Sequence, residues 1–73
     1  MNEFGVVLFH TTSAAFRGEK ILKRAGLPVK MIPTPRQFSS NCGFGLRFPW
    51  EAADRVHALL DAAGVETEGL HPV

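Results

Sequence analysis

A short apolar run of β-branched and aromatic residues lies near the start of the chain: Phe4-Gly5-Val6-Val7-Leu8-Phe9-His10. Such a composition is typical of a β-strand. The alternation of a strand places Phe4, Val6 and Leu8 on one face and Val7 and Phe9 on the other. Because both faces are apolar, we predict that this strand lies in the centre of a sheet.

A helix is predicted after this strand. Thr11, Thr12 and Ser13 offer N-cap hydroxyls, and one side of the segment from about residue 14 to 25 is apolar or small. That side comprises Ala14, Gly18, Ile21, Leu22 and Ala25. The segment closes on Ala25-Gly26-Leu27-Pro28, which is typical of a helix end with glycine at C′.

The rest of the chain repeats this plan. We predict an edge strand at 29–32, bracketed by two prolines, and an alternating strand at 44–48 whose residues Phe44, Leu46 and Phe48 share a face. A second helix follows from about residue 50 to 63, with an apolar stripe made of Ala52, Val56, Leu59, Leu60 and Ala63. It closes on Ala63-Gly64-Val65, and a final strand is expected at 66–73.

The element order βαββαβ predicts an α+β fold, the ferredoxin-like split βαβ sandwich. Right-handed crossovers give a four-stranded antiparallel sheet in the order 4-1-3-2, with both helices on one face. The 73 residues fit a single domain, residues 1–73.

Composition narrows the function classes. The chain has one cysteine, which allows no internal disulfide and favours a reducing, cytoplasmic compartment. The net charge of +1 argues against binding of nucleic acid by charge alone. No basic-flanked signal peptide or membrane span is evident. One cysteine and scattered histidines predict no four-ligand metal site, and nothing in the sequence calls for a cofactor.

The cysteine lies in the segment Pro33-Thr34-Pro35-Arg36-Gln37-Phe38-Ser39-Ser40-Asn41-Cys42-Gly43. Two prolines stop regular pairing at its entrance, and Gly43 suits the turn into the next strand. Small polar neighbours leave a thiol accessible and offer it hydrogen-bond donors. Two interpretations follow: Cys42 is a small packing residue, or it is a reactive thiol.

The predicted topology favours the second interpretation. The first two strands run parallel, so the Cys42 loop, His10, Thr11 and the start of the first helix share one edge of the sheet. A helix N-terminus favours an anion such as a thiolate. Arg36 adds a positive charge, and His10 is a candidate base or hydrogen-bond partner.

These residues resemble a small family of selenium/sulfur carrier-like proteins. The resemblance lies in Ile32-Pro33-Thr34-Pro35-Arg36, in Ser39-Ser40-Asn41-Cys42-Gly43, in the strand with Arg47, and in the helix segment 15–22 with its Ala25-Gly26 stop. It covers nearly the whole chain. Two departures, Phe16 and Gly18, stand where an aliphatic residue and an alanine are usual.

The resemblance implies that Cys42 bears the chalcogen, as a persulfide or selenopersulfide, received from a donor enzyme and passed to an acceptor enzyme. The protein is then a co-substrate and not itself an enzyme. We expect Arg36, Ser39, Ser40, Asn41 and the backbone N–H groups near Gly43 to support the anion, with His10 and Thr11 beside them.

The sequence also allows two other classes of function. A non-catalytic interaction or ligand-sensing module would carry Cys42 incidentally. Single-stranded nucleic-acid binding through the strand Gly43-Phe44-Gly45-Leu46-Arg47-Phe48 fits less well, because its three apolar residues share one face and leave no stacking pair on the other.

We also predict an exposed apolar patch. If the helices cover the face with Phe44, Leu46 and Phe48, the other face carries Val7, Phe9 and Ile32 together with Gly45 and Arg47. Such a patch favours a homodimer through the open sheet face, or docking of a partner enzyme there.

Overall fold

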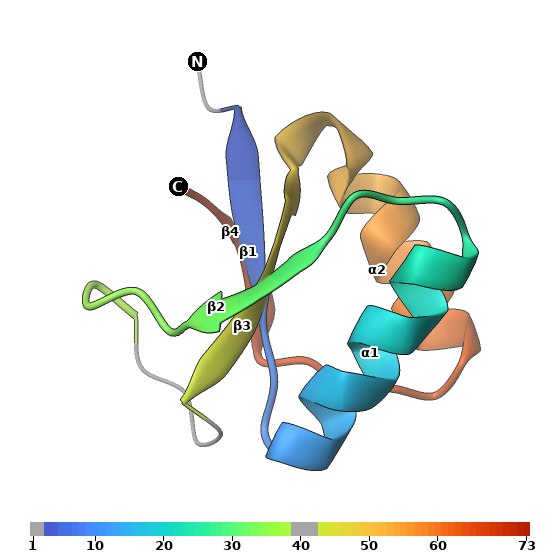
Figure 1. Cartoon of the computed structure of the whole chain (residues 1–73), viewed down its shortest axis with the longest axis horizontal. Helices are drawn as coiled ribbons and strands as arrows, with labels where there is room; N and C mark the ends of the chain where they lie inside the picture. The colour runs from blue at the N-terminus through green and yellow to red at the C-terminus, as the bar shows by residue number, and fades with distance from the viewer. Residues whose placement is uncertain (1–2, 39–42) are drawn as a thin grey trace.

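The computed structural model describes residues 3–38 and 43–73 and forms one four-stranded sheet with two helices on one side of it (Figure 1). The elements in chain order are β1 (Phe4–Leu8), α1 (Thr12–Arg24), β2 (Lys30–Pro33), β3 (Phe44–Pro49), the 3₁₀ turn η1 (Trp50–Ala52), α2 (Ala53–Ala62) and β4 (Gly69–Pro72). The strand order is β2-β3-β1-β4, and each neighbouring pair is antiparallel. The predicted α+β architecture, consistent with a ferredoxin-like sandwich, is confirmed.

The register fixes which ends of the strands lie together. Leu8 of β1 is opposite Gly45 of β3, and Ile32 of β2 is opposite the same glycine. The end of β1, the end of β2 and the start of β3 therefore meet at one edge of the sheet. The chain enters α1 from this edge, as the sequence predicted.

Both helices end as their sequences indicate. The N–H of Leu27 donates to the carbonyl of Leu22, and the N–H of Val65 donates to the carbonyl of Leu60. Gly26 and Gly64, at the turning points, have φ of 83° and 73°. This conformation is the left-handed one that glycine adopts without steric cost, so each Ala-Gly-apolar signature stops its helix.

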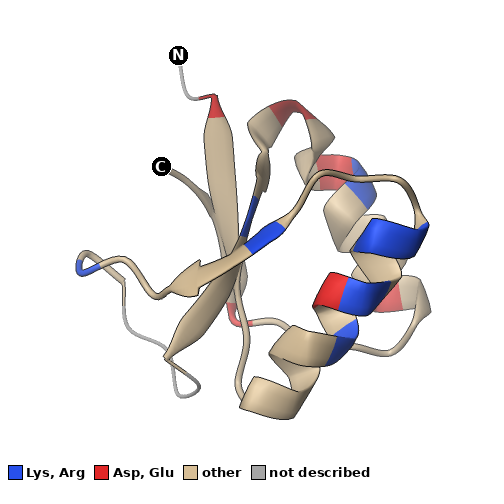
Figure 2. Ribbon diagram, viewed as in Figure 1, with Lys and Arg blue, Asp and Glu red and all other residues tan. Residues whose placement is uncertain are grey.

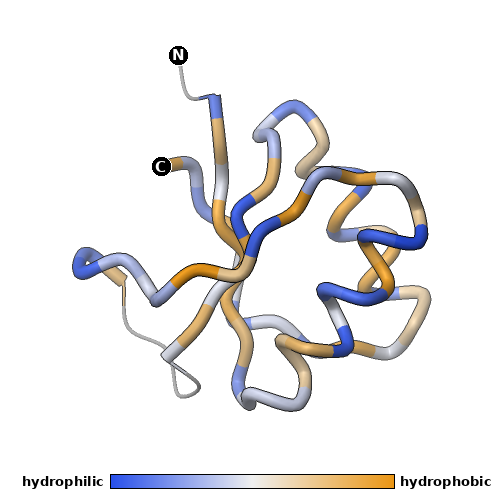
Figure 3. The backbone as a smooth tube through the Cα atoms, viewed as in Figure 1, coloured by the Kyte–Doolittle hydropathy of each residue, from blue (hydrophilic) through white to orange (hydrophobic). Residues whose placement is uncertain are grey.

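The main core lies between the sheet and the helices, and hydrophobic stretches lie along the strands and recur in both helices (Figure 3). The predicted alternation of β1 is confirmed, but the prediction that Val7 and Phe9 face away from the helices was wrong. Val7 is opposite Leu46, so it lies on the helix-covered face with Phe9, and neither is exposed to solvent. Phe4, Val6 and Leu8 lie on the other face. When both faces of a strand are apolar, the sequence does not show which face the helices cover. The pairing of Val7 with Leu46 of β3 shows it here.

The sheet face away from the helices, here called the open face, is not an exposed apolar patch. Val6 is 0% exposed and Leu8 is 2% exposed within one chain. The ring of Phe38, from the segment after β2, stacks on the ring of His71 in β4 with centroids 4.5 Å apart. Because β2 and β4 are the two edge strands, this segment crosses the open face. The open face thus offers no exposed apolar patch for a homodimer, and the oligomeric state stays a prediction.

Some element boundaries differ from the predicted ones. β1 ends at Leu8 and not at His10, because Thr11 already acts as the N-cap of α1. β4 begins at Gly69 and not at residue 66. Gly69 has a φ of 141°, a conformation that other residues rarely adopt. The second helix starts with the 3₁₀ turn η1 before α2.

Candidate functional site

The loop that carries the cysteine has a hydrogen-bonded base. The N–H of Thr34 donates to the carbonyl of Gly43 over 3.0 Å. This bond lies next to the last pair of the two strands, Pro33 and Phe44, on the loop side. Gly43 has a φ of 75°, the left-handed geometry expected of it. The predicted residues Ser39, Ser40, Asn41 and Cys42 lie outside the described residues. The strands therefore fix where this loop leaves and re-enters the sheet.

The base of the loop and the start of α1 lie at the same edge of the sheet (Figure 1). Thr11 is the N-cap of α1, and its Oγ1 accepts a hydrogen bond of 3.1 Å from the N–H of Ala14. This bond satisfies one of the unpaired donors of the first turn. The first turn of α1 has no acidic residue that would neutralise the remaining N–H groups. Arg36, in the segment after β2, is exposed.

His10 has a partner that the sequence did not predict. Its Nδ1 lies 3.1 Å from Oε1 of Glu68, just before β4. The histidine side chain is 49% exposed and the glutamate 18%, so water screens the pair and its contribution to stability is small. The pair connects the end of β1 to the entrance of β4, where the Glu68 N–H also donates to the Leu8 carbonyl over 2.7 Å.

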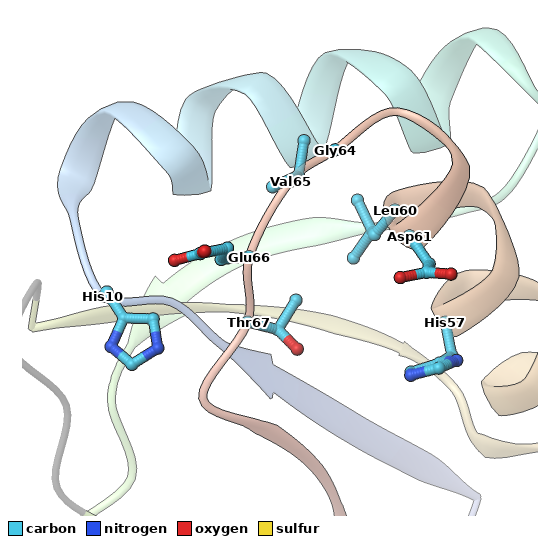
Figure 4. A pocket seen from close by; sticks show the side chains of 8 residues that line it. All are labelled: His10, His57, Leu60, Asp61, Gly64, Val65, Glu66 and Thr67. Carbon is cyan, nitrogen blue, oxygen red and sulfur yellow. The ribbon is translucent and has the colours of Figure 1, made fainter.

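His10 also lines a cleft on the side of the molecule that holds the helices (Figure 4). The cleft has a volume of about 600 Å³ and extends from His10 to His57 on α2. Its remaining lining residues come from the end of α2 and the segment after it: Leu60, Asp61, Gly64, Val65, Glu66 and Thr67. The sequence did not indicate this cleft or the position of His57 in it.

Two further residues near the loop were missed. Phe38 anchors the segment after β2 by stacking on His71, at an angle of 21° between the rings. Thr34 Oγ1, at the loop base, is shielded from solvent and has no hydrogen-bond partner in the described part of the chain. A shielded hydroxyl without a hydrogen-bond partner is energetically costly. No local pattern predicts either feature, because both depend on how distant segments pack.

Residues 3–38 and 43–73 contain no group of three or more His, Cys, Asp or Glu side chains that could hold a metal ion. Within the same residues, no helix is long and apolar enough to cross a membrane.

The sequence profile of the family described as "Putative Se/S carrier protein-like" matches residues 4–72. The chain belongs to this family. The match extends from the first residue of β1 to the last residue of β4, so it includes the whole Se/S carrier-like fold and the loop with Cys42. No curated protein and no solved structure matches the chain.

Proposed function

We propose that this Se/S carrier-like protein holds sulfur or selenium on Cys42 as a persulfide or selenopersulfide and passes it to an acceptor enzyme. The observation that carries the proposal is membership of the family over residues 4–72, which includes the chain's only cysteine. The arrangement around the loop supports it, because the loop base and the N-terminus of α1 share one edge of the sheet.

Loading is a thiol-exchange reaction. The Cys42 thiolate attacks the outer sulfur of a donor's persulfide, a new S–S bond forms, and the donor's own S–S bond breaks so that the donor leaves as a thiolate. A selenium atom at the outer position reacts in the same way, with the new bond joining Cys42 to selenium. No external oxidant is required, because the transferred atom keeps its oxidation level.

Discharge reverses these roles. A thiolate of the acceptor attacks the outer atom, the bond to Cys42 breaks, and Cys42 returns as a thiolate. One cysteine is enough for this cycle. The protein turns over as a co-substrate, and a reducing compartment such as the cytoplasm suits its free thiol.

The other proposed site residues stabilise the negative charge of the sulfur or selenium atom bound to Cys42. We assign to Arg36, Ser39, Ser40 and Asn41, with the backbone N–H groups near Gly43, the binding of the terminal chalcogen anion. Thr11 keeps the first turn of α1 formed, so that its unpaired N–H groups stay directed at this edge. His10, held by Glu68, is a candidate for proton exchange with an incoming thiol.

The test is loading of the purified protein. We expect incubation with a low-molecular-weight persulfide, followed by removal of the excess, to increase the intact mass by one sulfur atom. Reductant should reverse the increase, and Cys42→Ser should abolish it without unfolding the chain. A wild-type protein that stays unloaded under conditions that load glutathione would count against a carrier.

A non-catalytic interaction module is the second candidate. It makes the opposite prediction for the thiol, because a packing cysteine reacts only on unfolding. We expect a neutral-pH thiol reagent to modify native Cys42 at least as fast as free cysteine. If the reagent modifies Cys42 only after denaturant is added, the result favours the interaction module.

A further inference from the structure

Two cations face each other on the open face of the sheet. Lys30 of β2 and Arg47 of β3 are directly opposite in the antiparallel register, and the basic stretches of these two strands are blue in Figure 2. Their neighbours Met31 and Leu46 pack on the helix-side core, so the alternation of the strands puts Lys30 and Arg47 on the side away from the helices. Side chains at such positions have Cβ atoms about 5 Å apart, and like charges there destabilise a sheet. This arrangement needs an explanation.

No acidic side chain of the strands offsets the two charges. The strand positions that share this face are Phe4, Val6, Leu8, Lys30, Ile32, Gly45, Arg47, Pro49, Gly69 and His71. None of them is acidic. The ion pairs within the described residues join His10 to Glu68 and Lys23 to Glu19, so neither Lys30 nor Arg47 takes part in one.

Arg47 is held in place. Its guanidinium carbon lies 4.7 Å from the centroid of the Phe4 ring, which is within the range of a cation–π contact. Its neighbour Val6 is fully buried, and Arg47 itself is half-buried. Two other arginines, Arg17 and Arg55, donate instead to the carbonyls of Ala63 and Ala25 near the helix ends. The ring of Phe4 thus orients the guanidinium of Arg47 while leaving its N–H groups for another partner.

We propose that Lys30 and Arg47 bind a doubly charged tetrahedral oxyanion of the sulfate and phosphate class on the open face. The guanidinium offers two parallel N–H donors to two oxygens, and the ammonium supplies the second positive charge. A dianion between the two side chains converts a repulsive pair into two attractive ones. The site involves neither Cys42 nor its chemistry, so it goes beyond the carrier function.

The test is a ¹H–¹⁵N NMR titration of the full chain with sodium sulfate and with sodium phosphate, against sodium chloride at matched ionic strength. We expect saturable shifts at the Lys30 and Arg47 amides and at Arg47 Nε–H, with a Kd of about 1 mM, a weak affinity typical of an accessible two-cation site. Chloride should produce only small, unsaturated changes. Equal responses to chloride and to the dianions would overturn the proposal.

Variants separate the site from general charge effects. Arg47→Gln and Lys30→Gln should each weaken sulfate binding about tenfold, the equivalent of about 1.4 kcal/mol. Arg24→Gln removes the same charge from α1 and should leave the Kd unchanged. If Arg47→Gln loses its folded spectrum, the exposed Lys30 still provides the comparison. Binding that survives Lys30→Gln, or that falls equally in Arg24→Gln, would contradict the proposal.

One further binding experiment distinguishes a free oxyanion from the phosphate groups of a nucleic acid. A short single-stranded oligonucleotide presents phosphate groups as singly charged diesters in a polymer. We expect it to bind no more tightly per phosphate than free phosphate does. An affinity more than a hundredfold higher than that of free phosphate would assign the face to nucleic acid and would overturn the proposal of a small oxyanion.

Discussion

Phe38 stacks on His71 across the open face of the sheet, with ring centroids 4.5 Å apart and the rings 21° from parallel. The contact joins the segment after one edge strand, β2, to the opposite edge strand, β4. Phe38 also precedes Cys42 by only four residues. The fold thus ties the cysteine loop to the sheet at two points, the Thr34–Gly43 hydrogen bond and this stack.

The first prediction concerns this stack. Phe38→Ala should lower the free energy of unfolding by about 1–2 kcal/mol, because it removes the stack on His71 and the apolar surface that the Phe38 ring itself buries. His71→Ala should act through the same contact. In a double-mutant cycle measured by urea unfolding, we expect a coupling of about 0.5–1.5 kcal/mol between the two positions.

The matched control is Phe16, whose side chain is 56% exposed on α1. Phe16→Ala should change the stability by less than about 0.5 kcal/mol, as most surface substitutions do. Strictly additive effects of Phe38→Ala and His71→Ala would show that the stack does not contribute to stability in solution.

The second prediction concerns Phe9, which the sequence placed on an open apolar patch. Because Phe9 is fully buried in the core between the sheet and the helices, we expect Phe9→Glu to lose its folded state. An unpaired carboxylate in this core, together with loss of the ring, costs several kcal/mol, which is most of the stability of a domain this small.

Circular dichroism of Phe9→Glu should show loss of the helical signal, while Phe16→Glu should keep it. Sedimentation of the wild type at micromolar concentration separately reports whether the chain self-associates. A folded, monomeric Phe9→Glu protein would be incompatible with the burial described here.

Much of the fold was readable from the sequence because its signals are local. The two Ala-Gly-apolar helix ends, the Thr11 cap and the prolines around β2 each depend on a few neighbouring residues. The sheet order then followed from the handedness of the crossovers. What the sequence could not supply was which face of β1 the helices cover, since both faces of that strand are apolar.

The candidate site was predictable to a lesser degree. The edge shared by the loop base, His10 and Thr11 followed from the topology and is confirmed for these described residues. The His10–Glu68 pair, the Phe38–His71 stack and the unpartnered hydroxyl of Thr34 were not predicted. Each joins residues that are distant in the sequence or depends on packing around them, so no periodicity or spacing encodes it.

The third prediction tests the cap of α1. Thr11→Ala should remove the acceptor of the Ala14 N–H and lower stability by about 1 kcal/mol, whereas Thr11→Ser should retain most of it. In a domain of this size, that loss corresponds to a melting temperature lower by about 4–8 °C. Thr12→Ala, an exposed position beside the cap, should have a much smaller effect. Equal melting temperatures for Thr11→Ala and Thr12→Ala would show that the cap is unimportant.

The last prediction concerns the close packing of α1 on the sheet. A Cβ atom added at Gly18 would lie 2.8 Å from Cζ of Phe9 and 3.4 Å from Cδ2 of Leu60. Alanine is the better helix former by about 1 kcal/mol, so on an exposed helix this substitution would stabilise the protein. Here overpacking against a fully buried ring costs about 1–3 kcal/mol, and we expect a net loss of about 1 kcal/mol. In a Phe9→Leu background, which removes the contacted ring atoms, Gly18→Ala should instead be neutral or stabilising. Thermal unfolding of the four proteins of this cycle measures both effects, and a higher melting temperature for Gly18→Ala in the wild-type background would refute the steric argument.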